Sequence, residues 1–356
     1  MANVSATGSS TGSTPRSVDA DLAALTAAHN ARMAAIDRLI PASLVATASS
    51  AVPVPRPAYG VVAEELLVVP GAVGTARWTT VDPDSLSASW GALATGSLVS
   101  VRVAGDPSNP EAVGNSWSAP AAMDSLLTRL ASIPVPPEAE ALAEGDTGAG
   151  LMWPSRDTSM TRTFLRHGLS ARVHVAARLA GRPLPASPAP AGLVIRELTE
   201  RDIDAAAALQ LEVIRWDAQF DGVTLRESSP ARARDDVVEQ LGKARPSAWV
   251  AESDGTVVGL LTVAWPPETD WISQLVAADP TRIAYLGCLS IAPEHRSTGV
   301  GAALARFIHA ELDAAGVDVT LLHHAATNPL STPFWQRWNY RPLWTSWQAR
   351  PHFMLR

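Results

Sequence analysis

The stretch of the sequence best suited to chemistry is EHRSTGVGAAL, residues 294–304, between a β-rich run and a helical one. Gly299 and Gly301 allow a main chain to approach a ligand closely, and free N–H groups at a helix start attract anions. A diphosphate suits such a loop, although a tight turn without a ligand stays open. This stretch is not a Walker A loop, because it contains no lysine. It is not the dinucleotide fingerprint either, because Leu304 stands where the third glycine should be.

The elements that would position this loop alternate between strand and helix through the second half of the chain. Strand patterns occupy residues 193–200, 247–265, 282–293, 318–328 and 340–350, and helical spacing occupies 201–220, 231–244, 299–316 and 331–339. The segment 247–265 is expected to be a hairpin, because Ser253-Asp254-Gly255 favours a turn. This order predicts a mixed sheet flanked by helices, with the glycine loop where a strand passes into a helix.

Composition and charge exclude several classes of protein. The chain has 356 residues, enough for roughly two domains. A net charge of −7 argues against a nucleic-acid partner, since phosphate contacts need clustered Lys and Arg. No apolar run approaches the ~18 residues of a membrane span, and no basic, apolar leader opens the sequence. With Cys288 as its one cysteine, the chain fits a reducing compartment, so we expect a cytoplasmic protein without a membrane partner.

A proline-rich stretch, GRPLPASPAPAGL at residues 181–193, divides the chain. Its prolines remove backbone donors and block helix, which favours a semi-rigid linker. The predicted organisation is a disordered tail, a first domain, a linker and a second domain, at residues 1–16, 17–181, 182–192 and 193–356.

Between residues 193 and 350 the sequence resembles the GNAT superfamily of acyl-CoA N-acyltransferases. Residues 296–301, Arg-Ser-Thr-Gly-Val-Gly, are similar to that family's Arg/Gln-x-x-Gly-x-Gly/Ala motif. Pro293 stands where relatives commonly have proline, and Asn328 stands at a strand end where relatives often have a cofactor-contacting asparagine. The order of strands and helices resembles the GNAT order throughout this range.

The resemblance implies acetyl-CoA as co-substrate and no metal. In relatives, the main chain of the strand before the loop pairs with the pantetheine arm, and the loop amides cradle the diphosphate. The arginine either contacts phosphate or braces the loop, and the threonine can lend its hydroxyl. The implied cofactor-binding residues are Leu289, Ser290, Ile291, Arg296, Ser297, Thr298, Gly299, Val300, Gly301 and Asn328.

Acid–base chemistry is where this sequence departs from the family. Many relatives have a tyrosine as proton donor in the helix after the asparagine, and here that position is Trp335, which cannot serve. Tyr285, which occupies the position of a glutamate base in some relatives, and His324 are the candidate catalytic residues. Carboxylates and aromatic faces attract an amine cation, and the candidates for that contact are Trp216, Asp217, Phe220 and Asp270.

The first half carries a weaker resemblance to the same fold. It has Asp157, Phe164 and Gly168-Leu169 at the spacing of Asn328, Trp335 and Asn339-Tyr340 in the second half. A helical pattern at 121–132 stands where the cofactor helix would be, without a glycine loop before it. We therefore predict tandem GNAT-like α/β folds, each with a mixed central sheet flanked by helices, the first copy degenerate and non-catalytic. An unrelated helical and β domain is the alternative.

Together these features predict an acetyl-CoA-dependent N-acetyltransferase. The expected reaction is direct transfer of acetyl to a primary amine of a small molecule or peptide, and a homodimer is left open. A non-catalytic acyl-CoA-binding or interaction protein, which kept the loop and lost the acid, is the competing hypothesis.

Overall fold

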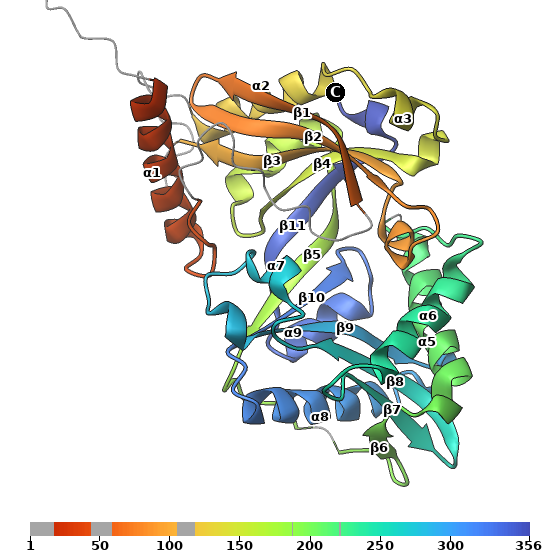
Figure 1. The fold of residues 1–356 in the computed structure, drawn as a ribbon. Helices are drawn as coiled ribbons and strands as arrows, with labels where there is room; N and C mark the ends of the chain where they lie inside the picture. Colours follow the sequence, from red (N-terminus) through yellow and green to blue (C-terminus); the bar gives the residue numbers. More distant parts are fainter. Residues whose placement is uncertain (1–17, 44–58, 105–117, 187, 221) are drawn as a thin grey trace, which may run out of the picture.

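The computed structural model describes residues 18–43, 59–104, 118–186, 188–220 and 222–356. The predicted tail, residues 1–16, lies outside the described residues. One eleven-stranded sheet runs through the molecule, and helices flank it in both halves (Figure 1).

The described part of the first half contains five strands. Its elements are α1 (Val18–Ile36), β1 (Tyr59–Val69), β2 (Ala72–Val81), β3 (Ala94–Val103), α2 (Ala119–Ala131), α3 (Pro137–Glu140), β4 (Thr147–Pro154), α4 (Thr161–Arg166) and β5 (Ser170–Leu179). A short 3₁₀ helix, Leu86–Trp90, lies between β2 and β3.

The second half follows the predicted order. Its elements are β6 (Val194–Glu197), α5 (Ile203–Asp217), α6 (Ser229–Leu241), β7 (Ala248–Ser253), β8 (Thr256–Ala264), α7 (Asp270–Ser273), β9 (Ile283–Ile291), α8 (Val300–Ala314), β10 (Val319–Ala325), α9 (Ser331–Arg337) and β11 (Arg341–Ala349). The β7–β8 hairpin turns at Asp254 and Gly255, with φ of 50° and 75°. Positive φ at both positions is what a two-residue I′ turn requires, so the predicted hairpin is confirmed.

The two halves exchange their last strands. The sheet order is β1-β2-β3-β4-β11-β5-β10-β9-β8-β7-β6. Thus β11 lies between β4 and β5, and β5 lies between β10 and β11, with antiparallel pairing at each contact. Figure 1 shows β11 running into the first half and β5 running into the second.

The repeat predicted from spacing is present in the structure. In each half two parallel strands, β3 with β4 and β9 with β10, precede a short helix and a final strand. Asp157 follows β4 and Asn328 follows β10. After the short helices, Gly168 and Asn339 both adopt left-handed conformations, with φ of 76° and 64°. Equal backbone conformation at equivalent positions supports the tandem GNAT-like fold.

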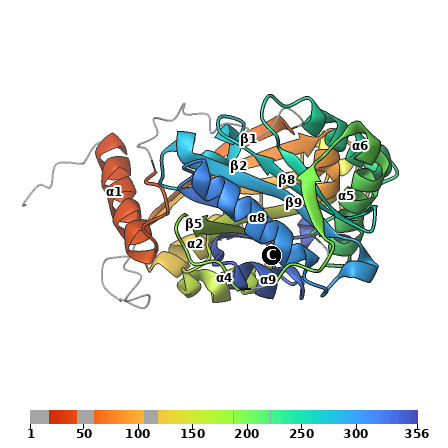
Figure 2. The ribbon, with the colours of Figure 1, turned by 90° about the horizontal axis from the view of Figure 1, so that it is seen from below.

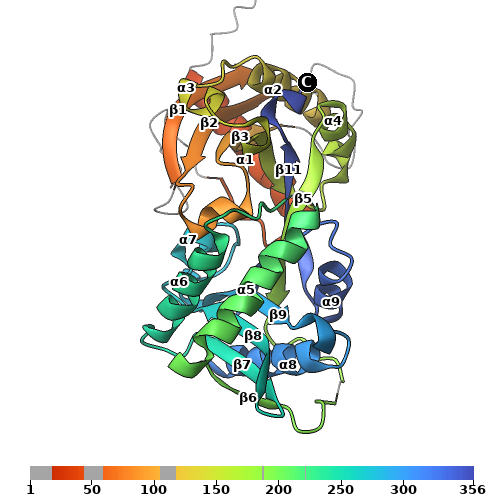
Figure 3. The same cartoon turned by 90° about the vertical axis from the view of Figure 1, so that its right-hand side faces the viewer.

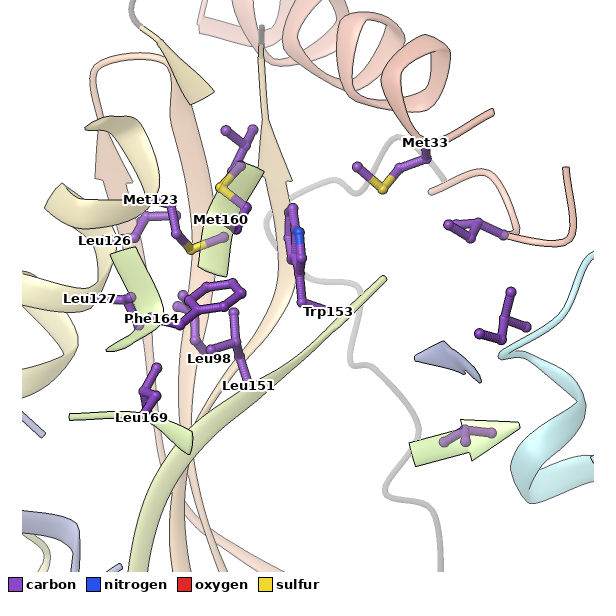
Figure 4. Packing of buried hydrophobic residues seen from close by; sticks show 14 of the residues in the cluster. Met33, Leu98, Met123, Leu126, Leu127, Leu151, Trp153, Met160, Phe164 and Leu169 are labelled. Carbon is purple, nitrogen blue, oxygen red and sulfur yellow. The ribbon is translucent and has the colours of Figure 1, made fainter. Parts of the chain in front are cut away.

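Separate apolar clusters hold the layers together. In the first half, α2 packs through Met123, Leu126 and Leu127 against the sheet and α4, next to Phe164 (Figure 4). In the second half α8 and α5 cover opposite faces of β8 and β9 (Figures 2 and 3). Consecutive residues of β8 point to opposite faces of the sheet, so Leu260 packs under α5 and Leu261 packs under α8. No helix in the described ranges is long and apolar enough to cross a membrane.

Candidate cofactor and acyl-transfer site

A fork between two parallel strands opens the candidate site. β10 pairs with β9 only from Val319 opposite Ile283 to Leu321 opposite Tyr285. Beyond that point β9 stays paired with β8 as far as Ile291, while β10 stays paired with β5. The two strands therefore diverge, and a cleft of about 580 Å³ lies at their open end.

The glycine loop forms one wall of this cleft. Ser297 and Gly299 have left-handed φ values of 63° and 100°, and α8 begins at Val300 with no side-chain cap. Across the described residues, the amides from Ser297 to Ala302 have no hydrogen-bond acceptor in the protein. Successive unpaired N–H groups at a helix start form a site for an anion.

The equivalent helix of the first half is closed by its own chain. The hydroxyl of Ser118 accepts a hydrogen bond from the amide of Ala121 at the start of α2. A capping serine satisfies one of the donors that a phosphate would otherwise bind. The two helices therefore begin differently in the two halves.

The two loop glycines face different surroundings. A Cβ on Gly299 would lie 3.6 Å from the Pro190 ring, so the proline-rich segment packs against the back of the loop. A Cβ on Gly301 would lie 3.5 Å from Ile291 and 3.7 Å from Phe334. Both of these side chains line the cleft, so a larger residue at position 301 would project into it.

Arg296 braces the loop against α5. Its guanidinium donates to Glu212 at 2.9 Å and lies 4.8 Å above the Trp216 ring. Of the two roles left open by the sequence, this geometry favours bracing. Thr298 donates its hydroxyl to the His295 carbonyl within the loop, and Ser290 donates to the Leu209 carbonyl of α5. Both hydroxyls therefore donate within the protein, and Thr298 and Ser290 can contact a ligand through their main-chain groups.

Asn328 organises the inner end of the cleft. Its side chain, 2% exposed, accepts hydrogen bonds from the amides of Leu330 and Ser331 through Oδ1. Its Nδ2 donates to Asp217 Oδ1 at 2.8 Å. Burial raises the pKa of Asp217 to about 6, opposed by the hydrogen bond from Asn328. The structure thus brings α5, β9, the loop and the start of α9 together around one carboxyl group.

Six predicted residues are not among those that line the cleft: Thr298 and Val300 of the loop, and the candidates Tyr285, His324, Asp270 and Phe220. Tyr285 donates to or accepts from His323 Nδ1 at 3.0 Å and packs edge-on against Trp271. His324 is buried, its ring edge-on to that of His174 in β5. Asp270 begins α7, and Phe220 packs behind Trp216. Neither candidate catalytic residue is therefore positioned to touch a substrate in this cleft.

Trp335 occupies the place of the family's tyrosine and is 7% exposed. It packs edge-on against Phe334 and Tyr340. Tyr340 is itself buried, which raises the pKa of its phenol, so no phenol substitutes for the missing donor at this position.

Other lining residues were not predicted from the sequence. They lie in the loop, on α5 or α8, or in the segment from Pro329 to the end of α9: Val213, His295, Ala302, Pro329, Leu330, Ser331, Pro333, Phe334 and Arg337. Their position in the sequence could have indicated some of them, because the residues directly after Asn328 continue the wall of the cleft that this asparagine begins. Arg337 adds an exposed cation beside the cleft.

In the first half the residue equivalent to Asn328 is engaged by protein groups. Asp157 is 6% exposed and accepts hydrogen bonds from Arg32 of α1 and from Trp153 Nε1, the latter at 2.9 Å. Asp157 is thus paired with a buried arginine of α1, whereas its equivalent Asn328 is paired with Asp217 of α5.

One family model matches the part of the chain that holds this site. Residues 210–340 match the family model described as the acetyltransferase (GNAT) family. That range holds the loop, the fork and Asn328, so the match covers the candidate site. No curated protein matches the chain.

Several solved structures resemble the chain at low identity. A GCN5-related N-acetyltransferase from Sphaerobacter thermophilus is 14% identical, with a TM-score of 0.46, over 79% of this chain and 81% of that one. One from Kribbella flavida is 15% identical, with a TM-score of 0.41, over 80% and 88%. A tandem GNAT protein from the clavulanic acid biosynthesis pathway is 16% identical, with a TM-score of 0.41, over 83% and 84%.

Proposed function

We propose that the second half binds acetyl-CoA in the cleft and transfers its acetyl group directly to a primary amine of a small molecule or peptide. The observation that carries the proposal is the β9–β10 fork opening beside the unpaired amides of residues 297–302. Those amides would bind the diphosphate. The free edge of β9 at Leu289 and Ile291 would pair with the pantetheine arm as an added strand does.

Chemistry in this arrangement needs a polarised carbonyl and a neutral amine. The thioester would lie in the fork, where a main-chain N–H of β9 near Leu289 can donate to the carbonyl oxygen. The amine nitrogen forms the new bond to carbon, the C–S bond breaks, and sulfur leaves as a thiolate that gains the proton shed by nitrogen. No acyl-enzyme is required, and Cys288 is unsuited to form one because burial raises its pKa.

The proposal predicts that Gly301→Glu abolishes acetyl-CoA binding without unfolding the protein. The new side chain would fill the cleft between Ile291 and Phe334 and place a carboxylate where the diphosphate binds. Isothermal calorimetry should show at least a 100-fold loss of affinity. The matched control is Ala310→Glu, which puts the same charge on an exposed position of the same helix and should bind as the wild type does. Equal affinity of the two variants would refute the placement of the diphosphate.

A non-catalytic acyl-CoA-binding protein is the second candidate, favoured by one observation. Trp335 fills the position of the family's tyrosine, and Tyr340 is buried beside it. A coupled assay for free CoA, over polyamines, aminoglycosides, amino acids and N-terminal peptides, separates the two. Turnover of any amine supports the transferase, and tight binding of acetyl-CoA without turnover supports the binding protein.

A further inference from the structure

Asp217 differs from the buried aspartates of the described chain in lacking a cationic partner. Asp37, Asp157 and Asp202 are 3–6% exposed, and each is paired with an arginine: Arg341, Arg32 and Arg196 respectively. Asp217, although partly buried at the end of α5, receives its one described hydrogen bond from the neutral amide of Asn328. A desolvated carboxylate without a cation is unfavourable, which indicates that a cationic ligand completes the site.

The position of this carboxyl group suits the reaction. Asp217 lines the cleft together with Leu289 of the fork and Asn328. Trp216, the neighbouring residue of α5, presents an aromatic ring to the same cleft. An ammonium group entering here would meet an aromatic face and a carboxylate at once.

The other charged groups around the cleft leave Asp217 available. Arg296 is paired with Glu212, and His295 belongs to the loop. Arg337 lies on α9, where it lines the cleft. Beneath the carboxyl group, the thiol of Cys288 is buried and protonated at neutral pH.

We propose that the carboxylate of Asp217 binds the acceptor as an alkylammonium ion and removes its proton before the amine attacks the thioester. The inference rests on the proposed function and narrows the acceptor to amines that are cationic at neutral pH. One proton passes from nitrogen to Asp217, and the freed lone pair forms the C–N bond. Asp217 then releases its proton to solvent after the product leaves.

The protonation state of Asp217 agrees with this role. Its pKa is raised to about 6 by burial. At pH 7 the ionised form then exceeds the protonated form by roughly tenfold, so the group is ready to accept a proton. A base works best with a pKa close to the working pH. Activity should therefore fall as the pH drops through 6.

The test compares wild type with Asp217→Asn, which preserves the size of the side chain and an acceptor for Asn328. We expect unchanged acetyl-CoA affinity by calorimetry and a loss of about 100-fold or more in kcat/KM for the best amine of the panel. The acid limb near pH 6 should disappear from the pH profile of the variant. Asp204→Asn, on an exposed position of the same helix, is the control and should retain rate and profile.

The outcomes separate this inference from the function on which it rests. If the KM of the variant for the amine rises, its kcat is unchanged and the acid limb near pH 6 remains, then Asp217 binds the amine without accepting its proton. That result overturns this inference and leaves the proposed function standing. A variant with wild-type kcat/KM also overturns it. Wild-type protein that does not bind acetyl-CoA overturns the proposed function itself, and binding without turnover of any alkylamine contradicts both.

Discussion

At the scale of single residues, burial decides which titratable groups can take part in chemistry. His29 and His309 are 4% and 0% exposed, and burial lowers the pKa of each to about 4. Both are therefore neutral in the folded protein at pH 7, as is the partly buried His174, whose pKa is also lowered to about 4. Burial likewise disfavours the charged form of Asp217, but for a carboxyl group this raises the pKa, to about 6.

These shifts predict acid sensitivity of the fold. Between pH 6.5 and about 4 the unfolded chain binds protons at His29 and His309 that the folded chain does not, so stability falls as the pH drops. Each contributes about 1.4 kcal/mol per pH unit in that window. Asp217 opposes this below pH 6, because its folded form binds the proton more tightly. Urea unfolding should therefore have a lower midpoint at pH 5 than at pH 7, and a constant or rising midpoint would contradict the buried, neutral histidines.

The residues that sequence patterns predicted best are those whose role is local. The left-handed φ of Gly299 follows from the tight turn made by its sequence neighbours, and the turn at Asp254-Gly255 likewise depends on those two residues. Tyr285 could not be placed in this way, because its environment comes from His323 on another strand and from Trp271 in α7. The burial of Asp217 likewise depends on Asn328, which follows it by more than a hundred residues.

At the scale of elements, the loop between α5 and α6 is fastened to the first half. Arg226 donates to the Ala88 carbonyl at 2.7 Å and pairs with Asp146 at 2.8 Å. The amide of Thr224 donates to the Ser89 carbonyl. This loop follows the helix end that carries Asp217, so the first half holds part of the candidate amine site in place.

Arg226→Ala should therefore affect both stability and amine recognition. Buried partners left unpaired typically cost about 1–3 kcal/mol, and release of the loop should raise KM for the amine while acetyl-CoA affinity stays unchanged. Arg234→Ala, which removes an exposed ion pair with Asp204, should change stability by no more than about 0.5 kcal/mol. Denaturant titration and steady-state kinetics on both variants are the measurements. Equal behaviour of the two would show that the anchor has no such role.

At the scale of the whole molecule, the exchange of final strands makes the halves interdependent. β5 completes the sheet beside β10, and β11 completes the sheet beside β4. The sequence could predict two similar folds, because the residues after Asp157 and those after Asn328 follow the same spacing. It could not predict the exchange, because the pattern of a strand does not say which neighbouring strand it pairs with. The domain boundary at the proline-rich segment stays a prediction, whereas the sheet itself runs through both halves.

The central claim is that the amides of residues 297–302 bind the diphosphate of acetyl-CoA. Amide hydrogen exchange over the whole chain tests it most directly, with acetyl-CoA and with S-acetylpantetheine, which lacks the diphosphate. We predict that acetyl-CoA slows exchange at residues 297–302 and along the free edge of β9, while S-acetylpantetheine at saturation slows exchange at β9 alone. Unchanged exchange at residues 297–302 with saturating acetyl-CoA would contradict the account.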